Sequence, residues 1–286
     1  MPLEIKGISH IYNKGLPQEQ KALTDITFTV ADNDLVAIIG HTGSGKSTLI
    51  QVMNGLIKPV SGEVLLNGQD INGSELKINV VRQKVGLVFQ YPEHQLFEET
   101  VYKDVAFGPR NLQLGEEEVD RRVLHALDLV GLNDEAFLHA SPFSLSGGEK
   151  RRAAIAGVLA MEPQFLILDE PTAGLDPRGR DDIMGAVVKL QKTVGITVIL
   201  VTHSMEEVAK YAHAVYVLNQ GRCILSGTPK EVFAQNEILQ STGLSLPAAA
   251  DIIMKLRSRG VTLPDALTIP EATKAIALAW RDKNVR

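Results

Sequence analysis

The sequence predicts an α/β fold in which helices cover a mainly parallel β-sheet, followed by a small C-terminal helical extension. Two observations predict it. Short apolar runs typical of buried strands alternate with helix patterns along much of the chain, as they do in proteins with parallel sheets. The 286 residues are 44% hydrophobic and 22% charged, which is the composition of an ordinary globular protein with a substantial core.

Charge and cysteine content exclude several kinds of protein. The formal net charge of −5 gives no electrostatic reason to expect nucleic-acid binding. Cys223 is the single cysteine, so the chain has no internal disulfide framework, and this fits a reducing compartment. The N-terminal sequence lacks a signal-peptide pattern, and no apolar run reaches the length of a membrane span. We expect a soluble, cytoplasmic protein.

The first forty residues are expected to form strands, and a helix follows them. The stretches LEIKGISHIY (3–12), TDITFTV (24–30) and LVAIIG (35–40) have strand patterns. A glycine-rich turn then leads into the helix pattern STLIQVMNGL (47–56). This order places the turn directly after a buried strand.

The segment from about residue 100 to 161 is expected to be mostly helical. Its stretch EEEVDRRVLHALDLVGL opens with acids, which favour a helix N-terminus, and spaces its apolar residues with a helical period. The residues expected on one face of this helix are Val119, Val123, Leu127 and Val130.

Strands and helices alternate again in the third part of the chain. QFLILDE (164–170) and ITVILVTH (196–203) are buried-strand patterns, and the helix pattern RGRDDIMGAVVKLQK (178–192) separates them. Two further short strands, AVYVLNQ (214–220) and RCILSG (222–227), meet at a glycine turn. Alternation of this kind predicts a mainly parallel sheet.

The turn GHTGSGKST fits the phosphate-loop pattern G-x-x-x-x-G-K-[ST] between a strand and a helix. Backbone N–H groups of such a loop form a concave anion site, with the helix dipole behind them. We expect Lys46 to reach the β- and γ-phosphates, Ser47 to ligate Mg²⁺, and the His41 side chain to point outward. The predicted phosphate-binding residues are Gly40, His41, Thr42, Gly43, Ser44, Gly45, Lys46, Ser47 and Thr48.

The strand pattern QFLILDE ends in two carboxylates, Asp169 and Glu170. Residues at the carboxyl end of a parallel strand face the ligand crevice of the sheet. We expect Asp169 to hold Mg²⁺, directly or through water, and Glu170 to polarise the attacking water. Alone, such a pair is as often a solvated strand end; beside a phosphate loop the catalytic interpretation is favoured.

Three more residues each have two interpretations. His203 ends the strand pattern ITVILVTH, where it can meet the γ-phosphate, although a lone histidine is more often structural. Gln90 ends the strand VGLVFQ and can contact Mg²⁺ or the attacking water, or be an ordinary polar strand end. Tyr12 can stack on adenine or be a half-buried strand tyrosine.

The phosphate loop, Gln90, LSGGE, LILDEPTAGLDP and His203 follow one another in compact order. Together they resemble the ATP-binding cassette (ABC) family, the nucleotide-driven motors of transporters. The resemblance covers about residues 2–235. It implies a P-loop NTPase fold: a RecA-like core, an antiparallel β subdomain and a helical subdomain at about 91–161. It also implies ATP and Mg²⁺ as cofactors, and ATP hydrolysis.

The same resemblance implies that two cassettes meet head to tail. Ser146, Gly147 and Gly148 open a helix where backbone N–H groups suit an anion, and they would face the γ-phosphate of an ATP bound to the other subunit. Asp176 matches the aspartate through which two cassettes communicate. Glu149 replaces the glutamine of the family's LSGGQ signature and adds negative charge there. The basic residues 150–152 are expected to be helix surface or subdomain contacts.

A narrower resemblance is carried by VFQYPEHQLFEETVYKDVAFGPRN and SPFSLSGGEKRR, which are similar to ATPase subunits of energy-coupling factor transporters, bacterial importers of vitamins and metal ions. PEHQLFEETV and the Glu-bearing signature resemble the second (A-prime) type. This implies a paralogous ATPase partner, a transmembrane coupling subunit and a substrate-binding membrane subunit, with this chain peripheral at the cytoplasmic face of the cell membrane. Phe97, Glu98 and Glu99 would then receive basic coupling helices.

Two alternatives remain: the ATPase of another ABC importer, or a soluble ABC ATPase of DNA repair or translation. The DNA-repair proteins usually carry a long coiled coil between the phosphate loop and the signature, and the translation proteins usually have two cassettes. This chain has neither feature. We expect an ATPase domain at 1–240 and a helical extension at 241–286, with a hinge near 244–251.

Overall fold

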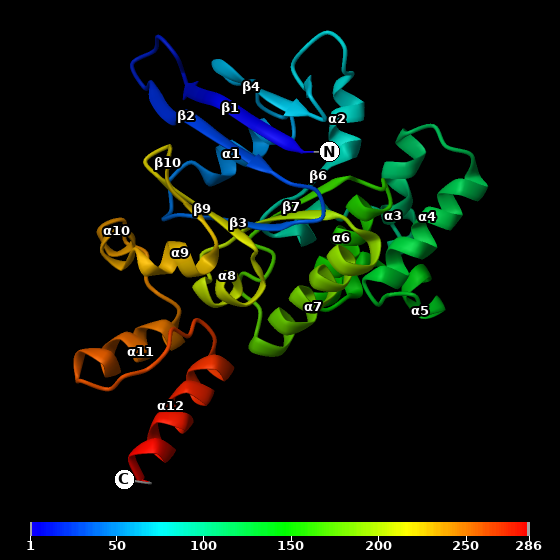
Figure 1. Cartoon of the computed structure of the whole chain (residues 1–286). Coiled ribbons are helices and arrows are strands. Elements are labelled where there is room, and N and C mark those ends of the chain that lie inside the picture. The colour runs from blue at the N-terminus through cyan, green and yellow to red at the C-terminus, as the bar shows by residue number, and fades with distance from the viewer. Residues whose placement is uncertain (1, 285–286) are drawn as a thin grey trace.

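The computed structural model describes residues 2–284, with side chains through Arg281, and confirms the α/β class (Figure 1). The strands are β1 Leu3–Tyr12, β2 Gln20–Val30, β3 Leu35–Ile39, β4 Ser61–Leu66, β5 Gln69–Asp70, β6 Val85–Val88, β7 Phe165–Asp169, β8 Thr197–Val201, β9 Ala214–Asn219 and β10 Arg222–Gly227. The α-helices are α1 Lys46–Met53, α2 Ile78–Lys84, α3 Val101–Asn111, α4 Glu116–Leu129, α5 Glu135–His139, α6 Gly147–Leu159, α7 Pro177–Val194, α8 Met205–Tyr211, α9 Pro229–Ala234, α10 Asn236–Ser241, α11 Ala248–Ser258 and α12 Ile269–Asn284. Two short 3₁₀ helices are η1 Pro92–Gln95 and η2 Pro142–Ser144.

The larger sheet has the strand order β10-β9-β3-β8-β7-β6. Every neighbouring pair in it is parallel except the hairpin β9–β10. Because β3, β8, β7 and β6 lie side by side and run in one direction, the loops that follow them emerge at one edge of the sheet. This topology brings the phosphate loop, His203, the Asp169–Glu170 pair and Gln90 to the same edge.

A second, antiparallel sheet has the order β2-β1-β4-β5. The sequence predicts β1 and β2, but the patterns considered above do not include β4 and β5. Only Val64 and Leu66 are buried in β4, so its pattern is too short to indicate a strand by periodicity.

Helices cover the parallel sheet because its strands are apolar on both faces: all five residues of β3, β7 and β8 are buried. One core lies between the sheet and helices α3, α4, α6 and α7, and another lies between the two sheets and α1. The four residues predicted on one face of this helix all belong to the first core, the last of them as the C-cap residue of α4: Val119, Val123, Leu127 and Val130. In Figure 1 the green helices α3–α6 form a lobe at one side of the sheet.

The C-terminal helices pack in two groups. A core around β9 includes α8, α9 and α10 and extends to Leu244, whereas α11 and α12 share a small core of their own that includes Ala249 and Ile253. In Figure 1 the orange and red helices α11 and α12 lie on the side of the molecule away from β1 and β4. The expected domain boundary at residue 240 falls near the end of α10 and stays a prediction. Residues 1, 285 and 286, at the outer ends of the two predicted domains, lie outside the described part of the chain.

The expected hinge at 244–251 is only partly a linker, because α11 already begins at Ala248. Among the described helices, none combines the length and the apolar character needed to cross a membrane.

Candidate nucleotide-binding site

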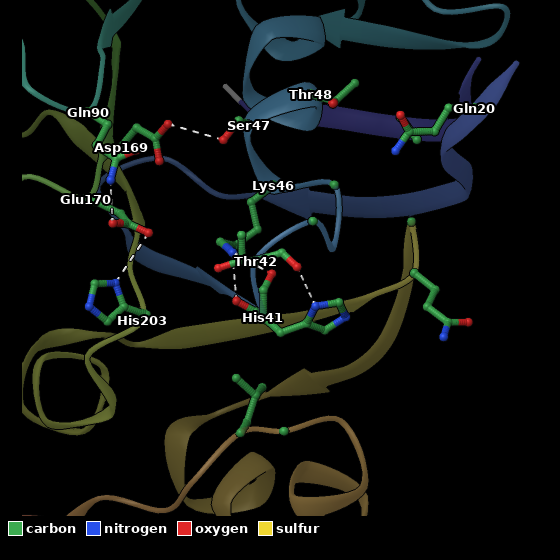
Figure 2. Close-up of a pocket in the computed structure, with 18 of the residues that line it drawn as sticks. Gln20, His41, Thr42, Lys46, Ser47, Thr48, Gln90, Asp169, Glu170 and His203 are labelled. Carbon is green, nitrogen blue, oxygen red and sulfur yellow. Dashed lines mark hydrogen bonds and ion pairs between the residues drawn. The ribbon is translucent and has the colours of Figure 1, made fainter. Parts of the chain in front are cut away.

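A cleft of about 880 Å³ lies at the carboxyl edge of the parallel sheet. The phosphate loop forms its centre, and Asp169, Glu170, Gln90 and His203 line one side of it (Figure 2). Tyr12 also lines the cleft. The fold therefore brings together side chains from five separate segments that the sequence predicts as one site.

The phosphate loop depends on glycine at the point where it turns into α1. Gly45 has φ 105°, and a Cβ atom there would lie 2.7 Å from the carbonyl oxygen of Ala22. The Lys46 Nζ donates hydrogen bonds to the carbonyl oxygens of Gly40 (2.7 Å) and His41 (3.0 Å). The lysine at the end of the loop thus binds the two residues at its beginning. Burial lowers the pKa of Lys46, while the carboxylates of Glu170 and Asp169 act in the opposite direction.

The prediction that the His41 side chain points outward is wrong, because both ring nitrogens have partners within the protein. Its Nε2 lies 3.0 Å from Asn219 Oδ1 at the end of β9, and its Nδ1 lies 2.6 Å from the carbonyl oxygen of Thr42. The partner Asn219 is far away in sequence, so only the β3–β9 pairing reveals the contact. Through its contact with Asn219, the His41 ring links the phosphate loop to strand β9.

Asp169 and Ser47 form the part of the cleft that suits a divalent cation. The Ser47 hydroxyl lies 3.5 Å from Asp169 Oδ2, and Asp169 is only 7% exposed. Burial, with the neighbouring Glu170 charge, raises the pKa of Asp169 to about 6, although Lys46 and Ser47 oppose the shift. A hydroxyl and a carboxylate are hard oxygen ligands, and a cation here would relieve the crowded negative charge. These residues fit Mg²⁺.

Glu170 lies between two polar partners at the cleft. Gln90 Nε2 donates to Glu170 Oε2 at 2.9 Å, and His203 Nδ1 lies 3.3 Å from Glu170 Oε1 (Figure 2). Glu170 adopts φ 46°, a left-handed conformation that is uncommon for a residue with a side chain. Its backbone N–H donates to the carbonyl oxygen of Val201 on β8 at 2.8 Å. A strained backbone of this sort is frequent at functional sites.

Tyr12 lies beside the beginning of α1. Its hydroxyl is 3.2 Å from Thr48 Oγ1, and its ring makes an edge contact with His10 at a centroid distance of 4.7 Å. The adenine-stacking role stays a prediction. The tyrosine is in any case a wall of the cleft.

The predicted signature residues lie outside this cleft. Ser146 is the N-cap of α6, and its hydroxyl and backbone N–H both donate to Glu149 Oε2, at 2.7 and 2.8 Å. The Glu149 carboxylate is thereby turned back onto the helix start in a capping box, and these bonds lower its pKa. Asp176 is likewise an N-cap, of α7, and accepts from Gly179 N at 2.7 Å. In the part of the chain that the structure describes, none of these three residues lines the cleft.

Arg151 is a buried residue whose role the sequence does not indicate. It is 3% exposed, and its Nη1 donates to the carbonyl oxygens of Pro171 (2.7 Å) and Ala173 (2.9 Å), directly after Glu170. Its Nη2 approaches Glu93 at 3.4 Å, in the loop after Gln90. One guanidinium from α6 thus joins two loops of the cleft, which goes beyond the helix-surface or subdomain contact expected from the sequence.

Replacing Arg151 by Ala is expected to lower the free energy of unfolding by about 2–4 kcal/mol, because two carbonyl groups and Glu93 lose their buried charged donor. Urea denaturation followed by circular dichroism measures the change. Lys150→Ala on the same helix is the matched control and is expected to change stability by less than about 0.5 kcal/mol. Equal effects of the two variants would contradict the structural role of Arg151.

The comparison with known proteins agrees with the geometry. The family model described as ABC transporter matches residues 23–173. The chain belongs to the ABC transporter family. The chain is 50% identical over 284 residues to a Clostridium tetani protein, covering 99% of each chain, and 55% identical over 277 residues to a Symbiobacterium thermophilum protein, covering 96% of each. Both relatives are named energy-coupling factor transporter ATP-binding protein EcfA2.

Solved structures show the same fold. The cbiO1 protein of Clostridium perfringens, part of the ABC transporter complex cbiONQ, has a TM-score of 0.75 and 43% identity, covering 88% of this chain and 98% of that one. The cassette MJ0796, solved as a dimer in a post-hydrolysis state with ADP and Pi, has a TM-score of 0.70 and 30% identity, covering 80% and 99%. These matches confirm the predicted ABC fold and an ATP-hydrolysing ABC subunit of the energy-coupling factor A2 type.

Proposed function

We propose that this chain works with a paralogous ATPase subunit at the cytoplasmic face of a bacterial membrane, as the motor of an importer for vitamins or metal ions. One observation carries the motor role: the Glu170 carboxylate lies between Gln90 and His203 at the edge of a phosphate-loop cleft. A carboxylate in that position can accept a proton from water attacking the γ-phosphate. The catalytic set is therefore Glu170, His203 and Gln90. The importer part of the proposal is supported by the relatives named EcfA2.

The remaining residues of the cleft bind the nucleotide. Lys46 would exchange its bonds to the loop carbonyl oxygens for bonds to the β- and γ-phosphates. Ser47 and Asp169, with Gln90, would hold Mg²⁺, which neutralises phosphate charge as the bond to the γ-phosphate breaks. Tyr12 would cover the adenine.

The position of the signature supports a head-to-tail pair. Ser146, Gly147 and Gly148 begin α6 away from the cleft of their own chain, and a Cβ at either glycine would meet nothing within 4 Å. That exposed backbone leaves room for the phosphates of a nucleotide on a second cassette. Asp176, the exposed N-cap residue of α7, would contact the partner. The wide cleft is thus half of a complete site.

A groove of about 660 Å³ on the helical lobe fits a membrane partner. Phe97 and Phe107 line it, are 56% and 45% exposed, and contact each other edge to face at 4.9 Å. The buried Asp104 accepts the backbone N–H groups of Phe97 (2.9 Å) and Glu98 (2.8 Å), which fixes the loop beside the groove. We propose that a basic helix of the transmembrane coupling subunit binds here, next to Glu98 and Glu99.

Charge reversal at this edge tests the surface. The double variant Glu98→Lys/Glu99→Lys is expected to lower uptake about tenfold or more, because charged contacts to the membrane subunit become repulsive, and to lower basal ATP hydrolysis less than about threefold. Uptake is measured in cells and hydrolysis on the purified pair of cassettes. Glu116→Lys/Glu117→Lys, two adjacent exposed acids of the same lobe outside the groove, is the matched control. Equal loss of both activities, or of neither, would contradict the coupling surface.

Purification through an affinity tag on this chain tests the assembly as a whole. Mass identification is expected to find a second cassette and at least one membrane protein, and the purified complex is expected to hydrolyse ATP. Recovery with DNA-repair or translation proteins instead would overturn the transport proposal.

A further inference from the structure

Glu207 is a buried carboxylate placed between two loops of the cleft. It lies on α8 and is 7% exposed. Its Oε1 accepts from Thr172 Oγ1 at 2.6 Å, and its Oε2 accepts from Thr202 Oγ1 at 3.0 Å. Within the described residues it forms no ion pair, so two neutral hydroxyl groups are its side-chain partners. A buried charge with such limited compensation is costly, which suggests that its position serves the site.

Each threonine is close in sequence to a residue of the cleft. Thr172 follows Glu170 by two residues, and Thr202 directly precedes His203. Both hydroxyl groups are buried with their carboxylate partner, at 6% and 2% exposure for the two threonines. One side chain therefore connects the loop after β7 to the loop after β8.

The β8 side of this connection has a fixed geometry. Thr202 Oγ1 accepts from Ser204 N at 3.0 Å while it donates to Glu207, so its hydroxyl orientation is determined. Ser204 Oγ in turn accepts from Glu207 N at 3.3 Å as the N-cap of α8. The carboxylate is thus held relative to His203 from both its backbone and its side chain.

The loop after β7, which carries Glu170, is the part of the site whose position this connection would stabilise. Glu170 has a left-handed backbone, at φ 46°, that its residue type does not favour. Its carboxylate lies 3.3 Å from His203 Nδ1, and that separation depends on how the two loops sit relative to each other. The bond from Thr172 to Glu207 joins the Glu170 loop to α8, which begins two residues after His203.

We propose that Glu207 is the positioning residue that holds Glu170 and His203 at the relative position needed for hydrolysis. The inference rests on the roles proposed above for those two residues. A general base acts only within hydrogen-bond reach of its proton, and a misplacement of about 1 Å costs about 100-fold in rate. Glu207 is not among the residues that line the cleft; it acts through the two loops that Thr172 and Thr202 belong to.

The test measures kcat, KM and ATP affinity of the tagged membrane complex that carries Glu207→Ala. We expect kcat to fall about 30- to 100-fold while the Kd for ATP changes less than about threefold, because the phosphate loop is untouched. Glu207→Gln should keep kcat within about fivefold, since an amide can accept from one threonine and donate to the other hydroxyl group. Glu206→Gln is the matched control: its carboxylate is exposed on the same helix and accepts from Ala248 N instead.

A double variant separates positioning from a general loss of structure. If Glu207 acts through His203, then Glu207→Ala combined with His203→Ala should lose little more activity than His203→Ala alone. Thr172→Val and Thr202→Val provide milder disruptions of the same connection, each with an expected loss of about tenfold in kcat. Multiplicative losses, a raised KM at unchanged kcat, or turnover of Glu207→Ala within twofold of the wild type would overturn the inference.

The proposed function and this inference fail differently. Unchanged turnover in Glu170→Gln and His203→Ala would remove the roles on which the inference depends. Lost turnover in those two variants, together with an active Glu207→Ala, would remove the positioning role alone.

Discussion

Glu170→Gln is expected to stop steady-state ATP hydrolysis while ATP binding persists. The amide preserves the size of the side chain, and its oxygen can still accept from Gln90, which lies 2.9 Å from a carboxylate oxygen. Its NH2 group then faces the ring of His203, which lies 3.3 Å from the other carboxylate oxygen. It cannot take the proton of the attacking water. Loss of a general base costs about 100- to 10,000-fold in kcat. Phosphate release measures the loss, and equilibrium binding of ATP is expected to change less than about threefold.

The same variant is expected to accumulate the closed, ATP-bound pair, because closure adds contacts to ATP and hydrolysis no longer releases them. Size-exclusion chromatography with and without ATP detects the pair. Glu162→Gln is an informative control: Glu162 also has a left-handed backbone, at φ 54°, but it pairs with Arg121 and Arg122 outside the cleft. Hydrolysis at the wild-type rate by Glu170→Gln would remove the general-base role.

Lys46→Ala is expected to weaken ATP binding by about 30- to 4,000-fold. Lys46 is 8% exposed and its ammonium donates to loop carbonyl oxygens, so it can be redirected to phosphate oxygens without leaving the loop. Truncation of one partner of a buried charged hydrogen bond costs about 2–5 kcal/mol, and every 1.4 kcal/mol is about tenfold in affinity. Titration of ATP followed by calorimetry measures the change in Kd.

A second lysine of the cleft shows whether the effect of Lys46→Ala depends on the position of the lysine or only on the loss of a positive charge. Lys21 lies on β2, lines the same cleft and is exposed. Lys21→Ala is expected to weaken ATP binding less than about fivefold, because a solvated ammonium contributes little. If both lysine variants bound ATP equally well, or if Lys46→Ala matched the wild type, the phosphate-loop assignment would be wrong.

Much of the site could be predicted because its parts are local. The phosphate loop needs a strand, a glycine turn and a helix start in succession, and LVAIIGHTGSGKST provides them within fourteen residues. Asp169 and His203 stand at or just after the ends of strands β7 and β8, and parallel strands end at one edge. Residues that follow such strands converge whatever the details of packing.

Other features were not predictable because they depend on partners distant in sequence. The bonds from Arg151 to the carbonyl oxygens of Pro171 and Ala173, and the contact of His41 with Asn219, exist only once α6, β7 and β9 are packed. In the sequence Arg151 is one of three consecutive basic residues at an expected helix surface, and no periodicity singles it out.

By itself the sequence determined the class of fold, the nucleotide site and the family, because a phosphate loop and buried parallel strands have short-range patterns. The tertiary structure decided how the catalytic side chains are held. Glu207 illustrates the difference: it is one of two adjacent glutamates, and the chain order does not distinguish it from Glu206. Of the two, packing buries only Glu207, between Thr172 and Thr202, because it shares the buried face of α8 with Met205 and Val208.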